Sequence, residues 1–326
     1  YQVDEKEIIS FGNGTAALTS VLRAMNLPKG TFCVLPSWTF VATPAAAAAT
    51  GFVPYFMDVD AETWALEPDA VRKQLKNIPG QVSVVMVVAP FGAPLNVADW
   101  DRFTDDTGIP VVIDAAAAFD TVSVLPQMKP GKSPMMISLH ATKVCGMGEG
   151  GVVISSNKEF LIKARQMSNF GFWGSHNVSV AGTNGKMNEY SAAVGMAALD
   201  QWPQKRGAWL RLKLHYIDAL KKLEPKVKSP WLNEEWVSST CNVRLPVPDA
   251  TPVIAKLKEV GIESRQWWQL GCHRKEAYQN FPKTALPNTE KLANSVIALP
   301  FSIDMKREDI DYVVNTLDKV LASVNA

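Results

Sequence analysis

A lysine beside a glycine-rich turn is the residue of this sequence best suited to covalent chemistry. Lys143 ends the segment Ser138–Lys143 and is followed closely by the glycine-rich run Gly146–Gly151. A lysine amine that is withdrawn from water forms a Schiff base with a carbonyl compound. Glycines let a bound molecule approach the backbone closely. A single loop lysine is usually only solvated, so the interpretation depends on the residues that accompany it.

A carboxylate at the end of an apolar run is the second candidate. Asp114 closes the run Val111–Asp114 and precedes four alanines, Ala115–Ala118. Small neighbours would let a flat molecule approach, and the carboxylate could hold the proton of a pyridinium nitrogen through a charge-assisted hydrogen bond. The same position also suits a helix cap at a strand–helix turn. Both interpretations stay open from these residues alone.

A possible anion site lies near the start of the chain, at Asn13-Gly14-Thr15. Glycines immediately before a helix, followed by a hydroxyl residue, leave backbone amides free to bind phosphate at the positive end of the helix dipole. The alternative is that Gly14 and Thr15 only turn and cap the helix. The two commonest nucleotide loops, G-x-G-x-x-G and G-x-x-x-x-G-K-[ST], are absent.

The elements that must position these residues alternate between short apolar runs and helical patterns. Predicted strands are Phe32–Leu35, Val53–Asp58, Val82–Val88, Val111–Ile113, Met135–Ser138 and Val152–Ser155. Predicted helices are Thr15–Met25, Trp38–Thr50, Pro68–Leu75, Val97–Thr107 and Lys158–Met167. This alternation predicts an α/β fold with a mostly parallel central sheet covered by helices. Ligands of such sheets gather at the carboxyl ends of the strands.

The pattern changes in the second half of the chain. Residues 189–223 are expected to be helical, with a bend or break near Pro203, and the stretch Glu224–Pro230 is a connection. The remaining predicted elements are strands at Thr240–Leu245 and Ser295–Leu299 and helices at Ala250–Val260 and Glu308–Val324. We therefore predict a large α/β domain at 1–223 and a smaller C-terminal α+β domain at 224–326.

Composition excludes several classes of partner. Thirty-three basic and thirty-two acidic residues give a net charge of +1, so no global field would attract nucleic acid or an anionic membrane. The apolar stretch Phe40–Met57 consists mostly of small residues and is expected to be a buried helix and strand, because a membrane span needs about 20 strongly apolar residues. The four cysteines lack zinc-ligand spacing, and no basic and apolar leader opens the sequence. A soluble, cytoplasmic protein without a metal site is the expectation.

The order of these motifs resembles the DegT/DnrJ/EryC1/StrS family of sugar aminotransferases over nearly the whole chain. The matching segments are Asn13–Leu18, Pro36–Thr43, Asp58–Asp60, Ile113–Ala116, Ser138–Lys143, Gly148–Gly151, Gly182–Glu189, Gly261–Arg265 and Leu299–Pro300. Each motif is weak alone, and the ordered set is specific. The resemblance implies the aspartate-aminotransferase architecture (fold type I) and pyridoxal 5'-phosphate (PLP) as cofactor.

Residue by residue, the resemblance makes Lys143 the Schiff-base lysine and proton shuttle. It pairs Asp114 with the pyridine nitrogen and places Phe40 against the pyridine ring. Asn184 would reach the cofactor phosphate of a neighbouring subunit, which implies a homodimer with shared active sites.

The resemblance also assigns binding of the cofactor phosphate to Asn13, Gly14 and Thr15 together with the Ser138 hydroxyl. One departure concerns the ring: Ala117 stands where many family members have a glutamine near the cofactor ring. A second is Phe119, which replaces a usual histidine.

Four further residues are candidates for the substrate region: His140, Phe172, Trp267 and His273. His140 precedes Lys143 by three positions, and Phe172 lies in a glycine- and aromatic-rich loop. Backbone bonding by the histidine and packing of the tryptophan are equally open. A Cys272–His273 nucleophile pair is improbable because adjacent side chains point apart on an extended chain.

The predicted reaction moves an amino group from an amino acid, L-glutamate, to a keto group of a nucleotide-linked deoxysugar. Lysine rather than histidine at position 143 favours transamination over the dehydration that some members of the resembling family catalyse. A PLP-dependent sugar dehydratase and a catalytically silent homologue with a binding or regulatory role remain the alternatives.

Overall fold

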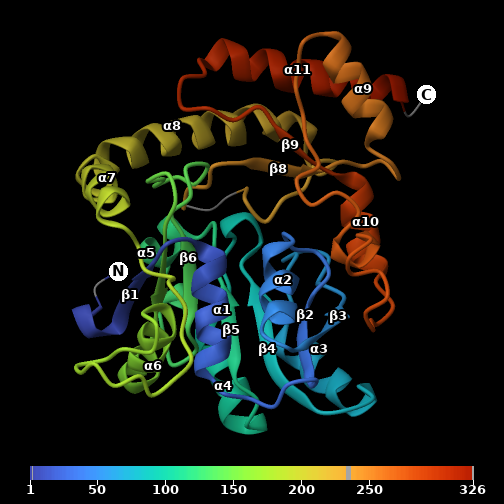
Figure 1. Cartoon of the computed structure of the whole chain (residues 1–326). Coiled ribbons are helices and arrows are strands. Elements are labelled where there is room, and N and C mark those ends of the chain that lie inside the picture. Colours follow the sequence, from blue (N-terminus) through green and yellow to red (C-terminus); the bar gives the residue numbers. More distant parts are fainter. Residues whose placement is uncertain (2, 233–235, 325–326) are drawn as a thin grey trace.

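A computed structural model describes residues 1, 3–232 and 236–324 of the chain. Its main feature is a seven-stranded sheet with the order β1-β7-β6-β5-β4-β2-β3 (Figure 1). Strands β2 to β6 run parallel to one another, whereas β7 is antiparallel to both β6 and β1. The strand bounds are β1 Ile8–Phe11, β2 Phe32–Pro36, β3 Val53–Met57, β4 Val82–Val88, β5 Val111–Asp114, β6 Met135–Ser138 and β7 Gly151–Ile154.

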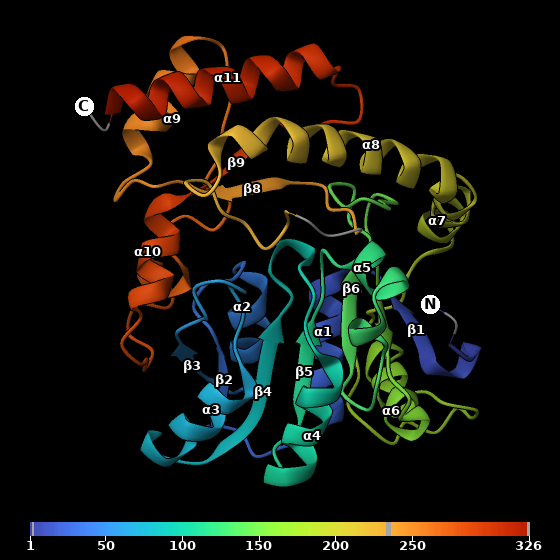
Figure 2. The ribbon, with the colours of Figure 1, turned by 180° about the vertical axis from the view of Figure 1, so that it is seen from behind.

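Both faces of this sheet are covered by helices, as apolar strands without alternation require. In β4, Val84 and Met86 belong to one core, and Val85 and Val87 belong to the other. Helices α1 (Gly14–Ala24), α2 (Ala42–Ala49) and α6 (Lys158–Ser168) cover the first face. Helices α3 (Pro68–Gln74), α4 (Val97–Thr107) and α5 (Phe119–Val124) cover the second. Figures 1 and 2 show these two layers from opposite sides.

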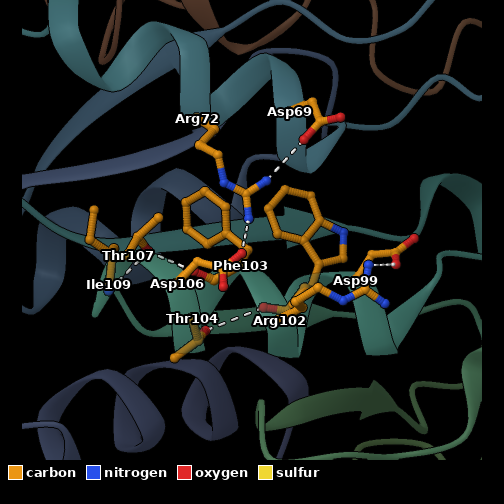
Figure 3. Close-up of polar contacts among 10 residues, drawn as sticks. Asp69, Arg72, Asp99, Arg102, Phe103, Thr104, Asp106, Thr107 and Ile109 are labelled. Carbon is orange, nitrogen blue, oxygen red and sulfur yellow. Dashed lines mark hydrogen bonds and ion pairs between the residues drawn. The ribbon is translucent and has the colours of Figure 1, made fainter.

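The outer layer shows how α3 is held against α4 (Figure 3). The Arg72 guanidinium lies 5.4 Å from the centre of the Phe103 ring. It pairs with Asp69 at 2.9 Å and with Asp106 at 2.7 Å. Both carboxylates are more than half exposed to solvent. This contact therefore combines apolar cover of Phe103 with ion pairs that water screens.

A second, two-stranded antiparallel sheet pairs β8 (Cys241–Arg244) with β9 (Val296–Leu299). The helices in this half of the chain are α7 Glu189–Asp200, α8 Trp202–Leu220, α9 Thr251–Glu259, α10 Pro287–Ser295 and α11 Arg307–Val324. Its core joins Leu212 and Tyr216 of α8 to Leu257 of α9 and Val314 of α11. Helix α8 thus packs with residues beyond position 224, and the predicted division at 223/224 stays a prediction.

Short 3-10 turns complete the described chain: η1 Glu5–Glu7, η2 Leu75–Asn77, η3 Pro90–Gly92, η4 Pro126–Met128, η5 Lys221–Leu223 and η6 Cys272–Arg274. The predicted α/β fold with a mostly parallel sheet is confirmed, and all predicted strands agree with the structure to within one residue at each end. The break near Pro203 is confirmed, because α7 ends at Asp200 and α8 begins at Trp202. No helix in the described ranges is long and apolar enough to cross a membrane.

Three expectations differ from the structure. The helix expected to start at Trp38 begins only at Ala42, and residues 38–41 form a loop. Strand β1 and helix α10 were not predicted. The prediction missed β1 because its four residues pair only at the sheet edge, with residues of β7 that lie at least 140 positions away in the sequence. Helix α10 was not predicted because it is short and polar over most of its length.

Candidate active site

The carboxyl edge of the large sheet brings Asp114 and Ser138 together. Asp114 is the last residue of β5 and Ser138 the last residue of β6, and the two strands are parallel neighbours. The amide of Ala115 donates to the carbonyl of Met136, which continues the pairing past the end of β5. Both side chains are buried. The edge at which parallel sheets bind ligands therefore carries a carboxylate and a hydroxyl.

Two protein donors bond to the Asp114 carboxylate, one to each oxygen. The Thr43 hydroxyl donates to Oδ2 at 2.8 Å, and the Ala116 amide donates to Oδ1 at 3.2 Å. The Thr39 hydroxyl lies 2.8 Å from that of Thr43. Burial raises the pKa of Asp114, and the hydrogen bonds from Thr43 and Ala116 and the charge of Lys143 oppose that rise. Asp114 does not cap a helix, because Ala118 precedes α5.

Lys143 lies in a tight hairpin between β6 and β7. Backbone hydrogen bonds close this hairpin: Leu139 to Gly150 at 2.9 Å, Ala141 to Gly148 at 2.8 Å, and Lys143 to His140 at 2.9 Å. Gly148 has a φ of +93°, a conformation that favours glycine. Burial lowers the pKa of Lys143, and the charge of Asp114 opposes that shift. Burial thus shifts both the buried Asp114 and the half-buried Lys143 toward their neutral forms, while each favours the charged form of the other.

Helix α1 begins next to Ser138 with open amides. The Asn13 side chain accepts from the Ala16 amide at 2.7 Å and caps the helix. Among the described residues, none accepts from the amides of Gly14 and Thr15. A Cβ on Gly14 would lie 3.4 Å from the Ser138 Cβ, so the helix start and the end of β6 are in close contact. Two free amides and a hydroxyl at a helix N-terminus suit a phosphate group.

The loop between β2 and α2 carries Phe40, which is 58% exposed. Aromatic rings support this loop from behind. Trp38 is buried and meets Trp268 edge-on at 5.2 Å, and Trp268 stacks on Phe91 at 3.9 Å. Phe91 has a φ of +54°, which is rare for a bulky residue. Phe40 is thus an exposed aromatic residue in a loop whose neighbour Trp38 is held by aromatic packing.

The histidine nearest to Lys143 is partly exposed. The Nδ1 atom of His140 lies 2.9 Å from the Thr142 hydroxyl, and its Nε2 atom lies 3.7 Å from Glu149. His140 therefore stands at the open side of the hairpin with a local hydrogen bond of its own.

His273 has a different environment, because its side chain is buried behind the Phe40 loop. The Nδ1 atom lies 2.6 Å from the Ser37 hydroxyl. Burial, followed by the charge of Arg274, lowers the pKa of His273. The structure therefore brings His273 to the loop of Phe40 rather than to an exposed surface.

The remaining predicted residues lie on loops. Trp267 is 43% exposed, with the Arg265 guanidinium 5.7 Å from its ring. Phe172 is half-buried in the loop that follows α6, where its amide donates to the Asn169 carbonyl. The Asn184 side chain accepts from Lys186 at 2.9 Å. Next to Asn184, the carbonyl of Gly185 accepts from the amide of Gly12, shortly before α1.

The positions that depart from the family pattern follow β5. A Cβ on Gly92 would lie 2.6 Å from the Ala117 carbonyl oxygen, so η3 presses against the backbone here. Phe119 packs in the core against Trp202, with ring centres 5.0 Å apart.

Asp120 is fully buried and accepts from Arg206 at 2.7 Å and from the Val237 amide at 2.8 Å. Asp120 therefore ties this segment to α8 and to residue 237.

Sequence reasoning missed Thr39 and Thr43 as neighbours of the carboxylate. Both lie inside the matched segment Pro36–Thr43. Thr39 lies in the loop before α2 and Thr43 in its first turn, so their contact is not set by helical spacing. Their link to Asp114 joins residues 71 positions apart and had no sequence signal.

The sheet order, the lysine hairpin and the strand-end carboxylate define the class: this is the fold type I architecture of PLP-dependent enzymes. The chain belongs to the DegT/DnrJ/EryC1/StrS aminotransferase family, whose sequence profile matches residues 2–318.

Individual relatives agree with this assignment. The chain is 26% identical over 321 residues to the dTDP-4-amino-4,6-dideoxy-D-glucose transaminase of Shigella dysenteriae, covering 95% of this chain and 84% of the relative. A crystal structure from Bacillus cereus ATCC 10987 matches with a TM-score of 0.89 at 29% identity, over 95% of this chain and 85% of that one. A structure of DesI with its TDP-sugar product matches with a TM-score of 0.83 at 29% identity, over 96% and 80% of the two chains.

Proposed function

We propose that this protein is a PLP-dependent aminotransferase that moves an amino group from L-glutamate to a keto group of a nucleotide-linked deoxysugar. The observations that carry the proposal are the buried Asp114 carboxylate and the half-buried Lys143 amine, each of which burial shifts toward its neutral form while its charge acts on the other. The family supports the reaction class. The dTDP-sugar transaminase and the TDP-sugar complex among the relatives support the substrate class.

The residues at this edge fit the cofactor. The open amides of Gly14 and Thr15 and the Ser138 hydroxyl would hold its phosphate, with Asn13 fixing the helix start. The exposed Phe40 ring would cover one face of its ring. When bound, the cofactor supplies an electron sink for the carbanion formed at the donor's α-carbon.

Asp114 would hold the pyridine nitrogen in its protonated form. Its carboxylate is desolvated, so a cation placed beside it restores the charged form that burial disfavours. The Thr43 hydroxyl and the Ala116 amide keep the carboxylate oriented for such a partner. A fixed ion pair in a buried site needs no reorganisation during the reaction.

Lys143 would hold the cofactor aldehyde and then move a proton. Burial lowers its pKa, so a larger fraction of the amine is neutral near neutral pH than for an exposed lysine. A neutral amine can accept a proton from the donor's α-carbon and return it elsewhere. The hairpin bonds around Lys143 limit the positions that its amine can reach.

Substrate contacts would come from the loops around this edge. His140 and Phe172 are half-buried and Trp267 is exposed, and we assign all three to the region that meets the sugar nucleotide. Ala117 leaves the cofactor ring without the polar side chain that a glutamine would add at this position.

A homodimer is part of the proposal. Helix α7 exposes the large apolar side chains Tyr190, Met196 and Leu199, as expected of a face that a second copy covers. In such a dimer, Asn184 would reach the cofactor phosphate of the neighbouring subunit.

An absorbance experiment tests the function. PLP added to the purified protein should give a yellow species that L-glutamate bleaches, and a nucleotide-linked keto-sugar should restore the colour. Lys143→Ala should abolish turnover, while Lys163→Ala, on the exposed face of α6, should behave as wild type. A protein that stays colourless with PLP would refute the proposal and favour a silent homologue. Loss of the sugar hydroxyl without amination would favour a dehydratase.

A further inference from the structure

The segment around His273 is clamped onto the loop that carries Phe40. The Cys272 amide donates to the Ser37 carbonyl at 2.9 Å, and the Cys272 thiol donates to the Thr39 carbonyl at 3.2 Å. The His273 amide donates to the Ser37 hydroxyl oxygen at 3.2 Å, and the imidazole Nδ1 lies 2.6 Å from the same oxygen. Ser37 is fully buried, and Cys272 and His273 are nearly so. Two segments more than 230 positions apart are thus fixed to each other.

The hydrogen bonds at Ser37 allow one arrangement in which the tautomer of the imidazole is fixed. The Ser37 oxygen already accepts from the His273 amide, and its only hydrogen is free to point at Nδ1. In that arrangement Nδ1 accepts, and the proton of the neutral ring sits on Nε2. The Nε2 atom faces the Glu290 carboxylate at 3.7 Å, which favours a proton there.

A directed chain of hydroxyls leads from this loop to Asp114. Since the single hydrogen of the Thr43 hydroxyl goes to Asp114, the Thr39 hydroxyl must be the donor to Thr43. The carbonyl of the same Thr39 accepts from Cys272. The clamp therefore holds the residue that begins the chain Thr39, Thr43, Asp114, and it also holds the backbone that carries Phe40.

We propose that His273, through Ser37, is a positioning residue that holds the loop 37–40 in place for the cofactor. It would act on two cofactor contacts at once, the Asp114 carboxylate and the Phe40 ring, without touching substrate. This inference rests on the proposed function, because it assigns His273 a part in cofactor binding. It also separates His273 from Trp267, which lies exposed on the same segment.

The test measures PLP affinity of the apoprotein by equilibrium dialysis, with no substrate present. His273→Ala removes the acceptor of the Ser37 hydroxyl and should weaken PLP binding by about tenfold, the effect of about one buried hydrogen bond. His273→Asn keeps an acceptor at the δ position and should restore most of the affinity. Ser37→Ala should match His273→Ala, and His215→Ala on α8 is the control histidine variant.

A second readout needs no cofactor. In the apoprotein labelled with ¹⁵N-histidine, one of the four imidazoles should show a protonated Nε2 and a hydrogen-bonded, unprotonated Nδ1. That signal should vanish in His273→Asn and shift in Ser37→Ala. If His273→Ala does not fold, Ser37→Ala and His273→Asn carry the affinity comparison.

The outcomes separate this inference from the function on which it rests. Wild-type protein that does not bind PLP refutes the proposed function, whatever the tautomer. Wild-type protein that binds PLP with unchanged affinity in His273→Ala and Ser37→Ala overturns the positioning role. So does an Nδ1-protonated His273. A variant altered only in the KM for the sugar substrate would assign His273 to substrate contact instead.

Discussion

Charged side chains differ in their exposure to water between two regions of the molecule. One region is the contact between α3 and α4, and the other is the carboxyl edge of the large sheet. On the outside, Arg72 meets Asp69 and Asp106 where all three side chains are at least a third exposed (Figure 3). At the sheet edge, Asp114 is buried and Lys143 is half-buried, and burial raises the pKa of Asp114 and lowers that of Lys143. The outer charges are hydrated and help to pack two helices, whereas the inner groups carry shifted pKa values of the kind that cluster at functional sites.

The largest effect is expected where the inner charge is removed without changing its shape. Asp114→Asn should lower the rate of the glutamate half-reaction by about 10²- to 10³-fold, the usual loss when one preorganised electrostatic partner of a reaction is removed. The rate is followed by the bleaching of the bound cofactor. The matched control is Asp106→Asn in the outer contact, which should leave the rate unchanged. Equal rates for Asp114→Asn and wild type would break the comparison.

A smaller effect is expected from the hydroxyl that orients this carboxylate. Thr43→Val keeps the volume and leaves a buried carboxylate oxygen and the Thr39 hydroxyl without their partner. The free energy of unfolding should fall by about 1–3 kcal/mol, the range for an unsatisfied buried polar group. Urea denaturation of the apoprotein measures it. Thr104→Val, at a more exposed hydroxyl on α4, should cost clearly less; a similar loss in both variants would contradict the special role of Thr43.

Lys143 gives a prediction of opposite sign. Its folded-state pKa lies below 10.5, so below that folded pKa the apoprotein holds a charged amine where burial disfavours it. Lys143→Met should raise the melting temperature of the apoprotein in that pH range, by about 2–4 °C for an effect on the order of 1 kcal/mol. The gain should shrink as pH rises toward 10.5, where the unfolded chain also loses its proton.

Calorimetry of the apoprotein across this pH range checks the sign. Lys163→Met, on an exposed surface, should show no such pH-dependent gain. A Lys143→Met apoprotein less stable than wild type near neutral pH would mean that the attraction of Asp114 outweighs desolvation.

The smallest effect is expected in the outer contact. Arg72→Met keeps apolar cover over Phe103 and removes two exposed ion pairs, so it should lower the free energy of unfolding by less than about 1 kcal/mol. The difference from wild type should shrink further in high salt because the exposed charges are screened. Urea titrations at two salt concentrations measure both. A loss comparable to that of Thr43→Val would show that exposure does not separate the two regions.

Elements with strong local patterns were predictable. The apolar run Val82–Val88 and the amphipathic segment Val97–Thr107 appear with the predicted bounds. Asp114 was placed at a strand end and Lys143 on a loop between two strands, and both positions are confirmed. Such features depend on periodicity and on residues close in sequence.

Features set by distant contacts were not predictable. The loop at 38–41 continues a helical pattern, yet its backbone bonds to Cys272 and its neighbour Ser37 bonds to His273. No sequence pattern near Ser37 predicts a contact with His273, which lies 236 positions away. The Thr43 to Asp114 bond has the same character, since it joins a helix to the end of a strand that the fold alone brings together.

The hairpin 139–150 has a consequence for how such proteins diverge. The two strands that flank it, β6 and β7, are paired within the large sheet. An inserted or deleted residue would therefore displace Lys143 or break the pairing of β6 with β7. The loops at 169–182 and 263–270 do not join two neighbouring strands of the large sheet. Changes of acceptor preference among related proteins should therefore arise through changes in the length or side chains of these two loops. The hairpin 139–150 should keep its number of residues.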